Sequence, residues 1–80
     1  MERLEITEKI NTIFIDVLDN EDIVITESTI ANDIDEWDSL THIQLVVAIE
    51  KYFKIRFTSK EIQSWNDVSE MITCIQEKRV

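Results

Sequence analysis

The chain has 80 residues, a length that gives one domain, residues 1–80, with a single modest core and little room for a substrate cleft. Its net charge of −9 disfavours nucleic acid and anionic membranes as partners. One cysteine excludes an internal disulfide, and the absence of glycine and proline excludes a glycine-built phosphate loop. With no signal peptide and no apolar run near the roughly 20 residues of a membrane span, we expect a cytoplasmic protein.

The first predicted element is a helix over residues 3–19. Apolar residues recur there at the three- and four-residue intervals of one helical face, and polar residues fill the other positions. The face consists of Ile6, Ile10, Ile13, Phe14, Val17 and Leu18. The polar run Asn20-Glu21-Asp22 ends the pattern, so this helix should lie along one side of the core.

Residues 23–37 show no sustained periodicity, which predicts a long irregular loop. Without glycine or proline, every turn of the chain should be made by Asn, Asp, Ser or Thr. Residues 23–26 have strand propensity, but no second segment offers a partner strand. A loop this long in a small domain is usually functional, and this one leads to Ser39. The expected apolar anchors are Ile23, Val24, Ile25, Ile30, Ile34 and Trp37.

The second predicted helix covers residues 40–53 and has Asp38 as its N-cap. Its expected inward stripe is Leu40, Ile43, Val47 and Phe53. Further apolar residues leave the helix hydrophobic on more than one face: Leu45, Val46, Ala48, Ile49 and Tyr52. So small a domain cannot cover all of them, so part of this helix should be free to dock on a partner.

Two more helices complete the prediction. Residues 54–57 form an extended connector, and Thr58 with Glu61 has the pattern of a capping box for a short helix ending near Ser64. Asn66 is the expected cap of the last helix. Its inward stripe is Val68, Met71, Ile72 and Ile75. The predicted fold is therefore all-α: a small four-helix bundle of three longer helices and one short helix, with a long loop between the first two.

No catalytic or metal site is predicted. Ser39 and His42 are three residues apart on a helix, but no third residue orients the imidazole and no oxyanion site is evident. We expect His42 to face solvent or a partner. A calcium loop starting at Asp33 would need glycine and glutamate where Asp38 and Gln44 stand.

Other chemistry-bearing residues also have structural interpretations. The lone thiol of Cys74 lies beside the inward stripe of the last helix, which favours a small buried apolar residue over a nucleophile. Trp37 and Trp65 are expected to pack in the core or at its rim rather than to recognise a ligand.

The run Asp38-Ser39-Leu40 at the start of an apolar helix resembles the attachment site of the acyl carrier protein family. The resemblance extends over residues 6–76. It implies that Ser39 receives 4′-phosphopantetheine from coenzyme A, and that the terminal thiol of this group holds acyl intermediates as thioesters. The chain would then be a shuttle and not an enzyme, in a fatty-acid, polyketide or related pathway.

The resemblance also implies the partners of a monomeric carrier. These are a phosphopantetheinyl transferase, an acyl- or aminoacyl-loading ligase, and downstream synthase or acyltransferase enzymes. The acids of residues 1–50 would steer basic surfaces of such partners toward Ser39. The expected docking residues are Asp38, Leu40, Thr41, His42, Val46 and Glu50.

Two departures from the family pattern leave alternatives open. Glu36 stands where carrier proteins often have glycine, so the local turn must differ. The second helix carries Thr41, His42, Gln44 and Lys51 where fatty-acid carriers tend to have acids, and this composition is closer to carriers of specialised pathways. The alternatives are an aminoacyl or peptidyl carrier, and a small helical adaptor that is never loaded and uses Ser39 as a cap.

Overall fold

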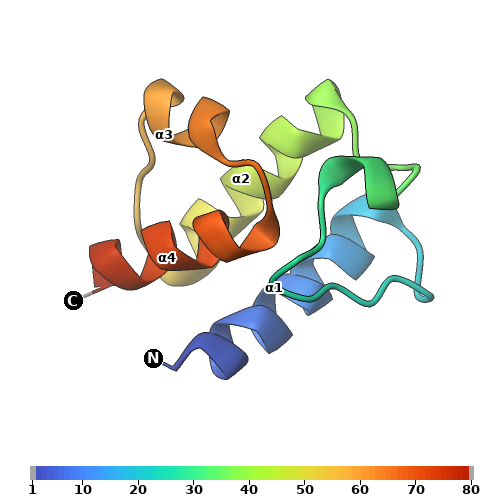
Figure 1. Ribbon diagram of the computed structural model, residues 1–80, viewed down its shortest axis with the longest axis horizontal. Helices are drawn as coiled ribbons and strands as arrows, with labels where there is room; N and C mark the ends of the chain where they lie inside the picture. The colour runs from blue at the N-terminus through green and yellow to red at the C-terminus, as the bar shows by residue number, and fades with distance from the viewer. Residues whose placement is uncertain (1, 80) are drawn as a thin grey trace.

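The computed structural model describes residues 2–79, apart from the side chain of Arg79. Its helices are α1 (Arg3–Leu18), α2 (Ser39–Phe53), α3 (Ser59–Ser64) and α4 (Val68–Arg79), and a 3-10 turn, η1 (Ala31–Asp33), lies in the α1–α2 loop (Figure 1). No residue of this range is in a strand, so the predicted all-α fold is confirmed. Within the same range, no helix is long and apolar enough to cross a membrane.

The core forms where α1 packs against α2 and α4. The predicted inward stripes of α1 and α4 are confirmed, apart from Val17, which is half-buried at the edge of the core. Each of these helices has one apolar and one polar side, so burial of the apolar side fixes its rotation. The largest fully buried side chains come from all three long helices: Phe14, Phe53, Ile6, Ile10, Leu45, Ile49, Met71, Ile72, Ile75 and Val68.

The predicted inward stripe of α2 is wrong in three of its four positions. Leu40, Ile43 and Val47 are exposed by 67%, 60% and 43%, and only Phe53 of that set is buried. The buried residues of α2 are instead Phe53 together with Leu45, Val46 and Ile49. Because α2 is apolar on more than one side, its sequence pattern is compatible with two rotations of the helix about its axis. Packing against α1 selects the rotation in which Leu45 and Ile49 face the core.

The α1–α2 loop is irregular, as predicted, but its anchors are fewer than expected. Ile23, Ile25 and Trp37 are buried in the core. Val24 and Ile30 are exposed, so they do not hold the loop. The amide side chain of Asn11 supports the extended part of the loop, because its Oδ1 accepts a hydrogen bond of 2.7 Å from the Ile25 N–H.

The same loop also covers the start of α4. The carbonyl oxygens of Thr29 and Glu27 accept hydrogen bonds from the N–H groups of Val68 and Ser69, at 3.0 and 2.8 Å. These N–H groups belong to the first turn of α4 and have no partner within the helix. The loop is therefore held by backbone hydrogen bonds as well as by apolar anchors.

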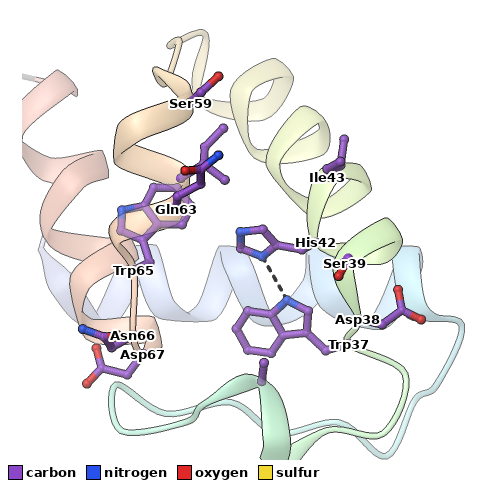
Figure 2. Close-up of a pocket in the computed structure, with 12 residues that line it drawn as sticks. Trp37, Asp38, Ser39, His42, Ile43, Ser59, Gln63, Trp65, Asn66 and Asp67 are labelled. Carbon is purple, nitrogen blue, oxygen red and sulfur yellow. Dashed lines mark hydrogen bonds between the residues drawn. The ribbon is translucent and has the colours of Figure 1, made fainter.

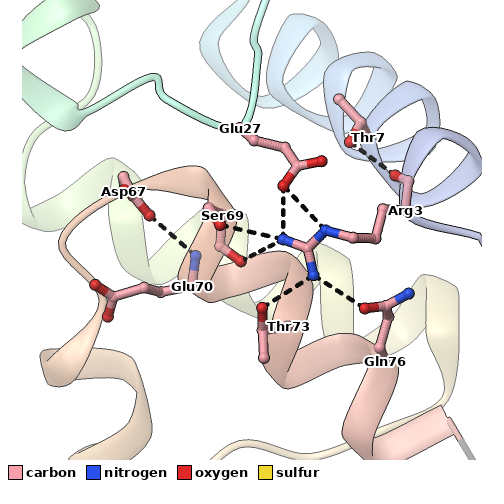
Figure 3. Close-up of polar contacts among 8 residues, drawn as sticks. All are labelled: Arg3, Thr7, Glu27, Asp67, Ser69, Glu70, Thr73 and Gln76. Carbon is pink, nitrogen blue, oxygen red and sulfur yellow. Dashed lines mark hydrogen bonds and ion pairs between the residues drawn. The ribbon is translucent and has the colours of Figure 1, made fainter.

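Arg3 joins α1, the loop and α4 (Figure 3). Its guanidinium donates to Glu27 Oε1 at 2.7 and 2.9 Å, to Thr73 Oγ1 and Gln76 Oε1 at 3.0 Å, and to the carbonyl and hydroxyl oxygens of Ser69 at 3.1 Å. The hydrogen bond from Arg3 lowers the pKa of Glu27. This one side chain ties the beginning of the chain to its last helix.

Two predictions about helix ends are wrong. The α4 N–H of Glu70 donates to Asp67 Oδ1 at 3.0 Å, so Asp67 is the cap rather than Asn66. The left-handed residues that follow α1 and α2 are Asp19 and Lys54, with φ of 53° and 58°. Asp19 is one of the four residue types expected in turns, but Lys54 is not, so the turn prediction is wrong after α2. There a lysine takes a conformation that usually favours glycine or asparagine.

The capping box of α3 is confirmed. Thr58 Oγ1 accepts from the Glu61 N–H at 3.1 Å, and Glu61 Oε1 accepts from the Thr58 N–H at 2.8 Å. Glu61 also pairs with Lys78 of α4 at 3.0 Å, and these hydrogen bonds, led by that from Thr58, lower the pKa of Glu61 to about 2. Cys74 is only partly buried, but burial, with Glu61 beside it, raises its pKa to about 11, so the thiol is protonated.

Candidate functional site

Ser39 is the first residue of α2, and its side chain is exposed. No described residue makes a hydrogen bond to its hydroxyl. The cap is Asp38, whose Oδ1 accepts from the N–H groups of Leu40 and Thr41 at 3.0 and 2.9 Å. In return, Thr41 Oγ1 accepts from the Asp38 N–H at 2.7 Å. The capping task is thus taken by Asp38, and the Ser39 hydroxyl is left available.

The electrostatics of this helix start favour an anion on the serine. The positive end of the α2 dipole and the N–H groups of its first turn lie at Ser39. Asp38 is ionised, because hydrogen bonds led by that from the Thr41 backbone lower the pKa of its carboxyl group. These bonds occupy the Oδ1 atom of that carboxylate, which keeps it bound to the helix backbone.

The turn before Asp38 needs no glycine. Glu36 is not among the positive-φ residues of the chain, so its side chain carries no conformational penalty. Its Oε2 accepts a hydrogen bond of 2.9 Å from Asn20 Nδ2, just after α1. The departure from the family pattern therefore adds a contact between the two ends of the loop.

Ser39 stands at the edge of an open groove of about 740 Å³ between the start of α2 and the α3–α4 segment (Figure 2). Its lining combines aromatic and apolar side chains with hydroxyl, amide and carboxylate groups. The lining residues are Ala31, Trp37, Asp38, Ser39, His42, Ile43, Ser59, Ile62, Gln63, Trp65, Asn66 and Asp67.

A row of rings crosses this groove and connects it to the core. Trp37 meets Phe14 edge-on at 4.9 Å between ring centroids and stacks with His42 at 5.9 Å. His42 lies edge-on to Trp65 at 6.0 Å, and Trp65 meets Phe57 at 4.9 Å. The expectation that both tryptophans pack in the core or at its rim is confirmed, and both also line the groove.

We expected His42 to face solvent or a partner; the structure contradicts the first of these orientations, and contact with a partner stays a prediction. Its Nδ1 accepts a hydrogen bond of 3.0 Å from the Trp37 indole N–H, and its ring is half-buried in the groove. Desolvation lowers the pKa of His42, and a hydrogen bond with the Ile62 backbone acts in the opposite direction. His42 is therefore neutral near pH 7, which leaves the Nδ1 lone pair free to accept from Trp37.

The other expected docking residues differ in whether their side chains are exposed or already used within the fold. Leu40 is exposed, and Thr41 is half-buried with its hydroxyl engaged in the cap. Val46 is only 3% exposed, so its assignment as a docking residue is wrong. Glu50 is half-buried, and its Oε2 accepts from the Phe57 N–H at 2.8 Å, which gives this acid a structural task.

The far wall of the groove was missed by sequence reasoning. It consists of residues from α3 and the following turn, among them Ile62, Gln63 and Trp65. These residues are more than twenty positions from Ser39. Ile62 and Gln63 belong to a short helix with no buried residue of its own, and Trp65 follows it. The one available signal was Trp65, a large aromatic residue in an otherwise polar turn, since such a residue must find a packing partner.

The arrangement presents the Ser39 hydroxyl as an accessible reactive group at the edge of the groove. Among the described residues, no group of three or more His, Cys, Asp or Glu side chains could hold a metal ion. The hydrogen bond of His42 is made to Trp37 rather than to Ser39. An exposed hydroxyl that lies at a helix N-terminus and beside a groove fits a covalently attached phosphate ester with a long arm.

Comparison with known proteins agrees with this geometry. A family model described as "Phosphopantetheine attachment site" matches residues 8–75. The solution NMR structure of a holo acyl carrier protein from Geobacter metallireducens is 39% identical in sequence and has a TM-score of 0.84, with 90% of this chain and 83% of that chain covered. The cofactor of this chain is accordingly a covalently bound phosphopantetheine. The chain belongs to the acyl carrier protein family.

Proposed function

We propose that Ser39 is the attachment residue and that residues 1–80 act as one discrete carrier domain. The observation that carries this proposal is the exposed Ser39 hydroxyl, which is the first side chain of α2 and is left unbonded because Asp38 caps the helix. The matched family model includes this position.

Loading would join Ser39 Oγ to the phosphorus that bears pantetheine in coenzyme A. The P–O bond to the adenosine-containing leaving group breaks, and the hydroxyl proton passes to a base of the transferase. The α2 N-terminus would stabilise the negative charge of the phosphodiester, and the groove beside Ser39 would be open to the arm. When bound, the group supplies a terminal thiol that holds an acyl group as a thioester. The chain itself would catalyse no step.

The partners would be a phosphopantetheinyl transferase, a loading ligase and acyl-transferring or synthase enzymes. The exposed residues Leu40 and Ile43 beside Ser39 offer an apolar contact to such partners. The neutral character of α2, with Thr41 and Gln44 in place of acids, supports a specialised pathway over housekeeping fatty-acid synthesis. An aminoacyl carrier would use the same chemistry. We propose that the carrier is a cytoplasmic monomer.

Intact-mass measurement after incubation with coenzyme A and a broad-specificity phosphopantetheinyl transferase tests the attachment. We expect one phosphopantetheinyl addition to the wild-type chain and none to Ser39→Ala. Ser59→Ala is the matched control, because Ser59 lines the same groove and should not affect loading. No addition to the folded wild type, or equal addition to Ser39→Ala, would overturn the proposal.

A further inference from the structure

Trp37 and His42 line the groove beside Ser39, and Trp37 also belongs to the core. Trp37 is 9% exposed and rests edge-on against Phe14, which is fully buried in α1. The Trp37 indole N–H donates to His42 Nδ1 at 3.0 Å, and Figure 2 shows the two side chains pointing toward each other. A chain that passes from Ser39 to the core beside Phe14 must displace this pair.

Displacing the pair is unfavourable. Separation of Trp37 from His42 leaves a buried indole N–H and an imidazole nitrogen without hydrogen-bond partners, which reduces the population of the open form roughly tenfold or more. It also removes the ring contact with Phe14. The groove outside the pair already offers apolar contact, from Ile43, Ile62 and Trp65, without any such rearrangement.

We propose that Trp37 and His42 form a barrier that determines cargo: the acyl group rests in the groove, and a long alkyl chain is not taken into the core. The inference rests on the proposed attachment at Ser39. It points to short or polar acyl groups as the cargo, because amide groups of Gln63 and Asn66 stand beside the aromatic surface and can hydrogen-bond a polar substituent.

Thermal unfolding of defined acyl forms tests the barrier. Butanoyl, octanoyl and dodecanoyl forms are made by transfer from the corresponding acyl-coenzyme A, and intact mass confirms loading first. A methylene that enters the core raises Tm by roughly 3–6 °C, so entry of a long chain would be evident. We expect octanoyl and dodecanoyl forms to agree within about 2 °C. A steady rise with chain length would overturn the inference although loading had succeeded.

Methyl NMR of isoleucine-labelled protein locates the cargo directly. Ile43 and Ile62 line the groove, whereas Ile10 and Ile49 are fully buried. Relative to the acyl-free holo form, the dodecanoyl form should have shifted Ile43 and Ile62 methyl signals. The methyl signals of Ile10 and Ile49 should stay near their positions in the acyl-free form. Equal shifts at the core residues would contradict the barrier.

A conservative variant tests the role of the pair. Trp37→Phe keeps a ring against Phe14 but removes the N–H that His42 accepts. We expect its Tm to rise from the octanoyl to the dodecanoyl form, with shifts at Ile49. Trp65→Phe is the matched control, because it changes the same groove and leaves the Trp37–His42 hydrogen bond in place. If the Tm values and Ile49 signals of the Trp37→Phe acyl forms match those of the wild type and of Trp65→Phe, the Trp37–His42 pair is not the barrier.

Discussion

At the start of α2, adjacent side chains have different tasks. Asp38 holds the helix end through its bonds to Leu40 and Thr41, and Ser39, one position further on, makes no side-chain bond to the described residues. A carrier needs this separation, because a serine that capped its helix would have to give up that bond whenever a phosphate was attached.

Substitution of these two residues should have unequal effects on stability. We expect Ser39→Ala to change the free energy of unfolding by less than about 0.5 kcal/mol, as for an exposed side chain without a partner. Asp38→Ala should cost clearly more, because two first-turn N–H groups lose their acceptor. Urea unfolding monitored by circular dichroism measures both. A loss of about 1 kcal/mol for Ser39→Ala would instead indicate a capping serine, as in a helical adaptor.

His42 should make stability depend on pH near neutrality. Its pKa in the folded chain lies below the ordinary histidine value of 6.5, so the unfolded chain binds the proton more readily. Stability is therefore full above about pH 6.5 and falls as the pH decreases through this value toward the folded pKa. Urea unfolding at a series of pH values between about 7.5 and about 5 measures the slope.

The control for this slope is His42→Gln. His42 is the one histidine of the chain, so no other side chain that ordinarily titrates in this pH range contributes. We expect a flatter pH dependence in the variant. An unchanged slope would show that His42 is equally easy to protonate in both states, and that the Trp37 hydrogen bond does not restrict its protonation.

At the scale of the element, α2 has two apolar faces with different functions. Leu45 and Ile49 lie in the core, and Leu40, Ile43 and Val47 are exposed. An exposed apolar stripe next to the modification site is costly to leave in water, and contact with a partner would cover it.

Two leucines on this helix allow a direct comparison. Leu45→Ala should cost about 2–5 kcal/mol of unfolding free energy, because its side chain is fully buried and its loss leaves a cavity. Leu40→Ala should change stability by less than about 0.5 kcal/mol, since this side chain is 67% exposed. Chemical denaturation of both variants provides the values. Comparable losses would mean that α2 is rotated relative to the structure.

How well the sequence predicts a buried helix face depends on how many apolar sides the helix has. Helices α1 and α4 each have one apolar side and one polar side, so their buried faces could be predicted. Helix α2 is apolar around most of its circumference, so local pattern fits two rotations and tertiary packing decides. The caps at Asp38 and Thr58 could be predicted because a cap depends on residues within three positions. Before α4 the neighbours Asn66 and Asp67 are both suitable cap residues, and the structure uses Asp67.

The candidate site was likewise predictable only in its local part. Ser39 and Asp38 follow from a short motif at a helix start. The groove depends on Trp65 reaching His42 from more than twenty positions along the chain. Likewise, the hydrogen bond between Trp37 and His42 depends on side-chain rotation that no spacing rule specifies, and its consequence for cargo appeared only with the structure.

The charge of the whole molecule is unevenly distributed. Residues 1–50 have thirteen acidic residues against two basic ones, whereas residues 51–80 have four acidic against six basic ones. Ser39 belongs to the acidic part, and exposed carboxylates such as Asp33 and Asp35 precede it in the loop. A partner with a basic surface would be attracted to this part of the molecule from a distance.

Association with the loading transferase should therefore slow as salt rises, while dissociation changes little. Long-range attraction acts on the association rate and is screened beyond about 8–10 Å near physiological salt, whereas the apolar contacts of Leu40 and Ile43 act after docking. Stopped-flow binding at increasing salt separates the two rates. Asp35→Asn should slow association more than Glu8→Gln, a matched loss of one exposed acid on α1. Salt-independent association, or equal effects of the two variants, would show that the acidic field near Ser39 does not steer the partner.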